Sequence, residues 1–550
     1  MSNAAIYLHT NGFDTSGERL LGRHAAGESF LRGFLRHADV DRFHLWNVAG
    51  VPTDELNNLV RRIEPPTKPV RWIAQHSRHE LTDPGVLNLP TPDLPREAWL
   101  RHAIGERRYA LCGITHTTAT DRVMRILGDM LIAPLDGHDA LICTSSAVRA
   151  AVDAQLDLMR DYMGREYGAR RRAELQRVTI PLGVNAADFS TTPEHRRAWR
   201  ERLNIPDDAI VALYVGRFNI KGKMNPALMA MALERAARSS GRTVYWVNSG
   251  WAESEEAGRV FHAETAKLCP SVQYREVDGR GVDTRFSIWS VADFFISFSD
   301  NIQETFGLTP IEAMAAGLPS VVSDWDGYKD TVRHGVDGFR IPTVAPSPGL
   351  GGDLAYWYAS AWLSYDNYVG AAGQFTAVDL GAAEAAITAL IADPDLRRRQ
   401  GEQAQARARQ IFDWSAIIPQ YQALWADQAE RLRAAPAGSA VRTNPYAPDP
   451  FTLFAGYPSR SLARHDIVTL RPEMSEDAAA ARLSAPLASY SRFNRPAPAE
   501  VARLVAHLMQ HGPTPVAALR ELFAPQRRNF IERGLLWMAR HDIVAIAEPG

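Results

Sequence analysis

The sequence predicts an α/β protein with two facing, doubly wound domains and a small, mainly helical C-terminal domain. Short apolar runs alternate with helical patterns over the first four hundred residues, as in parallel sheets covered by helices on both faces. A polar stretch at 191–208 divides these runs into two blocks. Beyond 435–460, which is rich in Ala, Pro and Gly, the apolar residues follow helical spacing.

These patterns predict five parts. Each block contains strand candidates, such as 140–144 in the first and 211–215 in the second. The last part has a helix–helix–helix–strand order that looks like a winged-helix module. The expected parts are a Rossmann-like N-terminal domain at 1–195, a second Rossmann-like domain at 205–410, a helix crossing back to the first domain at 411–434, a linker at 435–460, and the accessory domain at 461–550.

Composition narrows the class of protein. A net charge of -2 gives no general attraction to nucleic acid, so no nucleic-acid partner is expected. The three cysteines are scattered, which argues against a disulfide framework or a zinc site and fits the cytoplasm. We see no signal peptide and no apolar run of the roughly 18–20 residues that span a bilayer. Peripheral contact with the inner face of a membrane stays open as an alternative, because six arginines lie close together in the sequence. A solvated face is the simpler interpretation of these residues, which are Arg160, Arg165, Arg170, Arg171, Arg172 and Arg177.

The most informative segment is 300–319. It places Glu304 and Glu312 eight positions apart, on either side of a glycine turn that opens a helix. A helix start offers free N–H groups and partial positive charge, which suit a diphosphate. Two ordinary surface glutamates would be the bland interpretation of this spacing. The residues between them that we expect to contact the substrate are Phe306, Gly307, Leu308 and Thr309.

A second motif follows the first strand of the second block. Arg217 lies directly after this strand, and Lys221 and Lys223 precede a helix that Asn225 is expected to cap, with Pro226 at its first position. Two cations at this edge can neutralise a diphosphate leaving group. Spacing leaves the lysine open, and we favour Lys223 because it is nearer the helix start. A solvated basic turn is the alternative.

Two further candidates lie in the first block. His116 follows a probable strand at 109–112, although a lone histidine is more often structural than catalytic. Gly22 and Arg23 follow the first strand, in the stretch 12–27. Together with Pro181–Asn185 and Phe189, these motifs resemble glycosyltransferase family 4, retaining enzymes of the GT-B fold. The resemblance covers about residues 1–435 and is strongest over 209–343.

This resemblance implies roles for the candidates. Arg217 and a lysine would bind the diphosphate, Glu312 the ribose hydroxyls, and Glu304 and His116 the region of the transferred sugar. Gly22 and Arg23 would contact phosphate. Family members often carry Pro-Ser at Asp300-Asn301, and a Gly-Gly-x-x-Glu turn at 324–329, so the chain departs from the pattern at both places.

No metal or other cofactor is expected. Asp324 and Asp326 have the spacing of an Asp-x-Asp pair, but they precede a helix that we expect to lie away from the phosphates.

The resemblance implies a retaining glycosyltransferase that moves a sugar from a nucleotide-diphosphate sugar to a hydroxyl acceptor in polysaccharide or glycoconjugate synthesis. The acceptor stays open: a saccharide, a lipid-linked molecule or another alcohol. The alternatives are another GT-B enzyme, such as a phosphorylase or a sugar-nucleotide epimerase, and a sugar-nucleotide-binding regulator. A protein partner for 461–550 also stays open.

Overall fold

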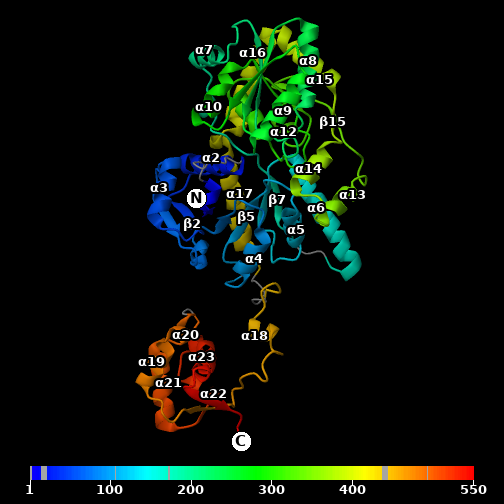
Figure 1. Ribbon diagram of the computed structural model, residues 1–550. Coiled ribbons are helices and arrows are strands. Elements are labelled where there is room, and N and C mark those ends of the chain that lie inside the picture. Colours follow the sequence, from blue (N-terminus) through cyan, green and yellow to red (C-terminus); the bar gives the residue numbers. More distant parts are fainter. Residues whose placement is uncertain are drawn as a thin grey trace. The chain divides into compact units, whose positions relative to one another are not determined.

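The computed structural model describes residues 3–13, 22–105, 107–170, 174–436, 444–491 and 494–549. The chain forms two compact units, Met1–Arg442 and Thr443–Gly550 (Figure 1). The first unit contains two parallel sheets, each covered by helices on both faces, and the second is a small, mainly helical domain. The predicted fold class is therefore confirmed.

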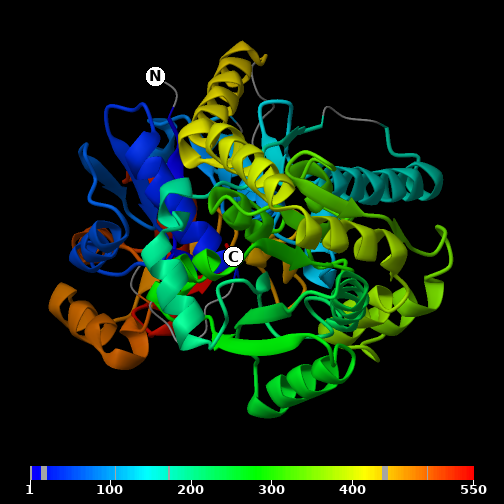
Figure 2. The ribbon, with the colours of Figure 1, turned by 90° about the horizontal axis from the view of Figure 1, so that it is seen from above.

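The first sheet has seven parallel strands in the order β3-β2-β1-β4-β5-β6-β7. Alternate residues of its strands point to opposite faces: Ile6 packs in the core beneath α2, α3 and α17, whereas Ala5 packs in the core beneath α4, α5 and α6. Figure 2 shows α6 as a long helix that projects from the domain. The strands are β1 (Ala5–Leu8), β2 (Phe43–Asn47), β3 (Val70–Ile73), β4 (Val86–Asn88), β5 (Ala110–Ile114), β6 (Ala140–Cys143) and β7 (Gln176–Thr179). The helices are α1 (Thr10–Phe13), α2 (Gly22–His37), α3 (Thr53–Ile63), α4 (Leu94–His102), α5 (Asp121–Asp129) and α6 (Ser146–Tyr167).

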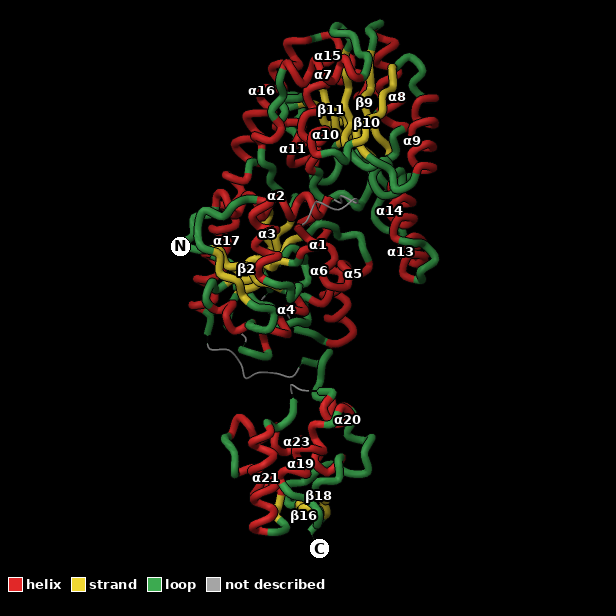
Figure 3. The backbone as a smooth tube through the Cα atoms, turned by 60° about the vertical axis from the view of Figure 1, so that its left-hand side comes forward, coloured by secondary structure: helices red, strands yellow, loops and turns green. Residues whose placement is uncertain are grey.

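The second sheet has six parallel strands in the order β10-β9-β8-β11-β12-β13, between helices on both faces (Figure 3). Along β8, Ala212 and Tyr214 pack towards α8 and α15, while Val211 and Leu213 face the core beneath α11. The strands are β8 (Ile210–Val215), β9 (Val244–Gly250), β10 (Gln273–Asp278), β11 (Phe294–Ser297), β12 (Ser320–Ser323) and β13 (Gly338–Ile341), with a separate hairpin of β14 (Thr343–Val344) and β15 (Ala377–Val378). The helices are α7 (Pro193–Arg202), α8 (Ala227–Ser240), α9 (Glu255–Lys267), α10 (Val282–Ser287), α11 (Leu308–Ala315), α12 (Tyr328–Thr331), α13 (Gly352–Ala359), α14 (Tyr365–Gly373), α15 (Leu380–Ala392) and α16 (Pro394–Arg407).

A long helix, α17 (Trp414–Ala434), returns from the second domain to the first after a π-helical segment, Ala408–Phe412. The side-chain amide of its Gln428 donates to the carbonyl oxygens of Leu111 on β5 (2.8 Å) and His138 (3.0 Å). No helix among the described residues is long and apolar enough to cross a membrane.

The second unit has its own core, which includes Val468, Leu504 and Leu535. Its strands form a small antiparallel sheet in the order β17-β16-β18. The exact hexapeptide Ala-Arg-His-Asp-Ile-Val occurs at 463–468 and at 539–544, and the two copies lead into β16 and β18, which pair with each other. The expectation of a winged-helix-like module stays a prediction. The elements are α18 (Pro450–Leu453), β16 (Ile467–Leu470), α19 (Glu476–Ser484), α20 (Pro486–Ser489), α21 (Pro498–His511), β17 (Thr514–Pro515), α22 (Val516–Glu521), α23 (Arg528–Arg540) and β18 (Val544–Ala547).

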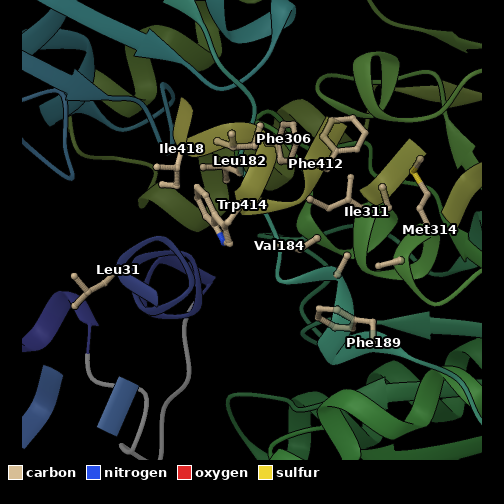
Figure 4. Packing of buried hydrophobic residues seen from close by; sticks show 14 of the residues in the cluster. Leu31, Leu182, Val184, Phe189, Phe306, Ile311, Met314, Phe412, Trp414 and Ile418 are labelled. Carbon is tan, nitrogen blue, oxygen red and sulfur yellow. The ribbon is translucent and has the colours of Figure 1, made fainter. Parts of the chain in front are cut away.

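The two doubly wound domains share one continuous apolar core. Figure 4 shows Trp414 between Leu31 of α2 and Ile311 of α11, with Leu182 and Ile418 beside it and Phe412 next to Phe306. Trp414 is buried, and its indole N–H donates a hydrogen bond to Ser29 Oγ at 2.7 Å. We call the cluster formed by Leu182, Val184, Phe189, Phe412 and Trp414 the domain seam.

Glycines leave space for the indole of Trp414 at the domain seam, and substitution of one of them tests how tightly the seam is packed. A Cβ added at Gly33 of α2 would lie 2.4 Å from Cγ of Trp414, whereas one added at Gly164 of α6 would meet no atom within 4 Å. We expect Gly33→Ala to destabilise the protein by about 1–3 kcal/mol through overpacking. Gly164→Ala is the matched control and should stabilise it by up to about 1 kcal/mol, because alanine favours the helix. The midpoint of thermal unfolding should fall in Gly33→Ala and rise in Gly164→Ala. Equal changes of the midpoint in the two variants would contradict a tightly packed seam.

Candidate active site

The phosphate-binding candidate is the loop between β11 and α11. Gly307 has a positive φ of 79° and a Cβ there would lie 2.1 Å from the ring of Tyr328, so the position requires glycine. Helix α11 begins at Leu308, and the first-turn N–H groups of Leu308 and Thr309 lack partners within the helix. Phe306 is buried and anchors the loop on the ring of Phe412.

Lys223 and Glu304 form an ion pair beside this loop, with 2.5 Å between Nζ and Oε2. Burial raises the pKa of Glu304, but the charge and hydrogen bond of Lys223 outweigh burial and lower that pKa below its usual value. Burial lowers the pKa of Lys223, and Glu304 outweighs it in turn, so that this pKa is raised. Both groups are therefore ionised at neutral pH.

Arg217 and Lys221 lie on the same β8–α8 loop but have other partners. Arg217 is a quarter exposed, and its guanidinium lies 3.3 Å from the more exposed carboxylate of Glu253. Lys221 donates to the side-chain oxygen of Asn367 on α14 at 2.8 Å. Of the two lysines that the sequence left open, Lys223 is the one placed against Glu304. Helix α8 begins at Ala227, one residue later than predicted, and Asn225 Oδ1 still accepts from the N–H of Ala227 at 3.0 Å.

Glu312 lines a polar pocket between the domains. The pocket has an empty volume of about 360 Å³ and includes Arg285 and Leu308 from the second domain and Arg32 from α2. Burial raises the pKa of Glu312, and the positive charge of Arg285 opposes this rise. This pocket thus presents a carboxylate and a guanidinium within the second domain, one turn along α11 from the phosphate-binding candidate.

His116 connects the two sheets. It follows β5, and its carbonyl oxygen accepts a hydrogen bond from Thr305 Oγ1 at 2.9 Å, next to Glu304. Burial lowers the pKa of the His116 imidazole to about 4, against a weaker contribution from a hydrogen bond to the backbone of Pro90. The ring is therefore neutral at pH 7. Gly22 is the first residue of α2, but the side chain of Arg23 lies outside the described residues, so the structure does not place these two phosphate candidates.

The turn at 324–329 lies closer to the site than the sequence suggested. Gly327 packs against the backbone of Phe306, and the ring of Tyr328 packs against Gly307. Ser145 on the first domain donates to the carbonyl of Thr305 at 2.7 Å, and its hydroxyl lies 3.5 Å from Asp326 Oδ1. The expectation that Asp324 and Asp326 lie away from the phosphate loop is wrong for Asp326. Sequence spacing could not show this, because the contact depends on how β12 lies beside β11.

Asp326 is partly buried, and the protein encloses its Oδ2 atom. Burial raises its pKa to about 8, and the negative charge of Glu304 adds to this rise. Its Oδ2 atom has no hydrogen-bond partner within the described part of the chain. Asp326 is therefore mostly protonated at neutral pH, so the site carries one negative charge fewer than its carboxyl groups suggest. Asp324 lies near Arg340, with 3.4 Å between the charged atoms.

Asp300 and Asn301, where the chain departs from the family pattern, form hydrogen bonds to the β8–α8 loop. Asp300 accepts from the N–H of Asn225 at 3.3 Å, and the Asn301 amide donates to the carbonyl of Lys221. Burial raises the pKa of Asp300 to about 7. These residues connect the end of β11 to the loop that carries Lys223.

Of the basic stretch, Arg160 and Arg165 lie on α6, and Arg177 lies on β7. Arg160 and Arg177 both contact Glu174, and Arg177 also contacts Asp153. Arg171 and Arg172 lie outside the described residues. No group of three or more His, Cys, Asp or Glu side chains in the described ranges could hold a metal ion.

The state of Asp326 predicts a pH effect on stability. The folded protein retains the Asp326 proton up to about pH 8, whereas the unfolded chain releases it near pH 4. Native stability from this group is therefore lost as pH rises between these values, by about 1.4 kcal/mol per pH unit. Asp326→Asn removes this loss, so its unfolding midpoint should exceed that of the wild type by more at pH 8 than at pH 5. Asp366→Asn, at an exposed position of α14, is the control; an equal gain at both pH values would contradict the assignment.

Comparisons with known proteins agree with this geometry. Residues 195–347 match the family model described as Glycosyl transferases group 1. The D-inositol 3-phosphate glycosyltransferase of Geodermatophilus obscurus is 33% identical over 186 residues, which is 33% of this chain and 39% of that protein. The lipopolysaccharide 1,2-N-acetylglucosaminetransferase of Salmonella typhimurium is 25% identical over 177 residues, 32% of this chain and 45% of that protein. The chain matches less than half of the length of either relative.

A solved structure shows the same architecture. Anabaena HepE in complex with UDP and glucose aligns with a TM-score of 0.50 and 16% identity, over 77% of this chain and all of that chain. At this identity the likeness concerns the fold alone. The two facing domains form a GT-B fold, and residues 195–347 match the glycosyl transferases group 1 model.

Proposed function

We propose that the protein is a retaining glycosyltransferase that moves a sugar from a nucleotide-diphosphate sugar to a hydroxyl acceptor in polysaccharide or glycoconjugate synthesis. The observation that carries this proposal is the Lys223–Glu304 ion pair at the start of α11, within the segment that matches the group 1 model. A cation and a carboxylate held together beside free helix N–H groups suit a site that binds both a diphosphate and a sugar.

In this proposal the donor diphosphate lies at the start of α11, where the N–H groups of Gly307, Leu308 and Thr309 can bind it. Arg217 and Lys223 neutralise its charge, and Glu312 binds the ribose hydroxyls from the neighbouring polar pocket. Glu304 and His116 then lie beside the donor sugar. The relatives that are glycosyltransferases, and the HepE complex with UDP, support a nucleotide sugar as the donor.

Transfer breaks the bond between the anomeric carbon and the phosphate oxygen, and the bonding electrons go to that oxygen. The acceptor oxygen bonds to the anomeric carbon on the same face, and its proton passes to the leaving phosphate. Configuration is retained, and no protein nucleophile is required. Arg217 and Lys223 stabilise the charge that develops on the diphosphate. The neutral His116 can hydrogen-bond the sugar without adding charge to the site.

We propose that no metal or other cofactor takes part, because two side-chain cations already face the expected diphosphate position. The Asp-x-Asp pair is also divided between two partners, because Asp326 lies beside Ser145 and Asp324 lies near Arg340. A phosphorylase would require inorganic phosphate for turnover, an epimerase would change the sugar without releasing nucleotide, and a regulator would bind without turnover. These outcomes separate the alternatives.

Nucleotide binding is the first test. Calorimetric titration with UDP, GDP and ADP should show tight binding of one nucleotide, with the same affinity in the presence of EDTA. Arg217→Ala should weaken that binding by about 10–150-fold, since a hydrogen bond to a charged group contributes about 1.5–3 kcal/mol. Arg259→Ala, at an exposed position of α9, is the control and should bind as the wild type does. Absence of binding by any nucleotide would overturn the proposed function.

Lys223 and Glu304 should separate nucleotide binding from turnover. Lys223→Met keeps the length of the side chain but removes its charge, so nucleotide binding should weaken by at least about tenfold. Lys221→Met, the matched substitution on the same loop, should cause a smaller loss because Lys221 bonds to Asn367 instead.

Glu304→Gln should leave nucleotide binding within a few-fold, because Glu304 is assigned to the sugar. Its turnover of the donor sugar should fall by about 10²–10³-fold, a range typical when one preorganised electrostatic contact is lost. Equal losses of nucleotide affinity at Lys221 and Lys223 would argue against the assignment of the lysine.

A further inference from the structure

A second pocket lies in the first domain, apart from the polar pocket of Glu312. It spans about 440 Å³ of space, part of which is open solvent, and lies where β1, β4 and β5 end, beneath α2 and α17. Most of its wall is apolar and includes Phe13, Phe30, Leu182, Trp414 and Tyr421. Among the residues that the structure describes, its wall contains no lysine, arginine, aspartate or glutamate. Its chemistry therefore differs from that of the donor side of the cleft.

One buried polar side chain faces this pocket. Asn88 is the last residue of β4 and only 6% exposed, and its backbone is held between Ile6 and Cys112 on the neighbouring strands. Its amide forms no side-chain hydrogen bond within the part of the chain that the structure describes, yet it lines the pocket. An amide that lines a pocket without a partner of its own is suited to bind a polar atom of a ligand.

The pocket is connected to the expected transfer site through His116. The imidazole of His116 is part of the pocket wall, and its carbonyl accepts the hydrogen bond from Thr305, the neighbour of Glu304. A molecule that fills the pocket would therefore have one end close to the donor sugar.

We infer that this pocket binds the apolar, uncharged portion of the acceptor, a hydrocarbon or aryl group attached close to the hydroxyl that receives the sugar. The inference rests on the proposed function. The described wall offers few groups that could satisfy the hydroxyl groups of a saccharide ring, and it presents no cation for a phosphate. Burial of hydrocarbon against this wall is favourable, and Asn88 supplies the convergent polar contact that such pockets use to orient a ligand.

Simple primary alcohols test this inference because they combine one hydroxyl with a hydrocarbon tail. Binding of 1-butanol, 1-hexanol and 1-octanol to the full chain would be measured by ligand-observed NMR in the presence of UDP. The dissociation constant should fall by about fourfold for each added methylene until the pocket is full, which is the effect of about 0.8 kcal/mol per buried CH₂. A dissociation constant that does not change with chain length would overturn the inference.

Two variants locate the binding. Ala26→Phe places a ring in the pocket from α2 and should abolish the dependence on chain length. Asn88→Leu should retain that dependence but lose the preference for 1-hexanol over its methyl ether. Ala154→Phe, at an exposed position of α6, is the control for the added ring and should behave as the wild type does. Dependence on chain length that persists in Ala26→Phe would place the alcohols elsewhere and contradict the inference.

UDP titration of the same samples separates the two hypotheses. Intact UDP binding with no response to chain length would reject the apolar acceptor and leave the transferase proposal standing. Failure of the wild type to bind any nucleotide would reject the proposed function instead. If Ala26→Phe does not fold, the chain-length series on the wild type still decides the inference.

Discussion

The domain seam is the constraint on which the rest of the first unit depends. Trp414 fills the space left by Gly33 and Gly183, and its indole is fixed by Ser29. The neighbouring Asp413 forms a β-bridge with Val184, so the chain is held where it passes between the domains. Because the seam joins both cores, the ends of β5 and β11 meet closely enough for Thr305 to bond with the carbonyl of His116. A site assembled from two sheets requires this fixed junction.

The negative charge of the carboxyl groups in the site is reduced in two ways, by an ion pair and by protonation. Glu304 and Lys223 neutralise each other, and Asp326 avoids a second negative charge beneath the loop by retaining its proton. Were Asp326 ionised, it would repel both Glu304 and an incoming diphosphate. Arg217 pairs, among the described residues, with the exposed carboxylate of Glu253 and can reorient at little cost. In the proposed function it would thus supply a positive group for the leaving group without burying an unpaired charge.

The sequence predicted most of the fold because buried parallel strands and helix starts are local patterns. Apolar runs identified β6, β8 and β12, and the glycine turn before α11 identified the phosphate-binding candidate. Spacing alone could not decide between Lys221 and Lys223, because that choice depends on Asn367, 146 positions away. It also misplaced Asp326 and gave no sign of Asn88 or Arg285. Those residues acquire their surroundings only when strands that are distant in sequence lie side by side.

The two pockets have opposite chemistry, and the seam explains how one cleft can contain both. The polar pocket lies between α2 and the second domain, where side chains from both domains supply charges. The apolar pocket lies within the first domain, against residues that already belong to the core. Trp414 and Leu182 are at once part of the seam and of the apolar wall. A ligand that packs against Trp414 contacts the residue that fixes the domains, so the proposed acceptor would share one set of apolar contacts with the domain arrangement.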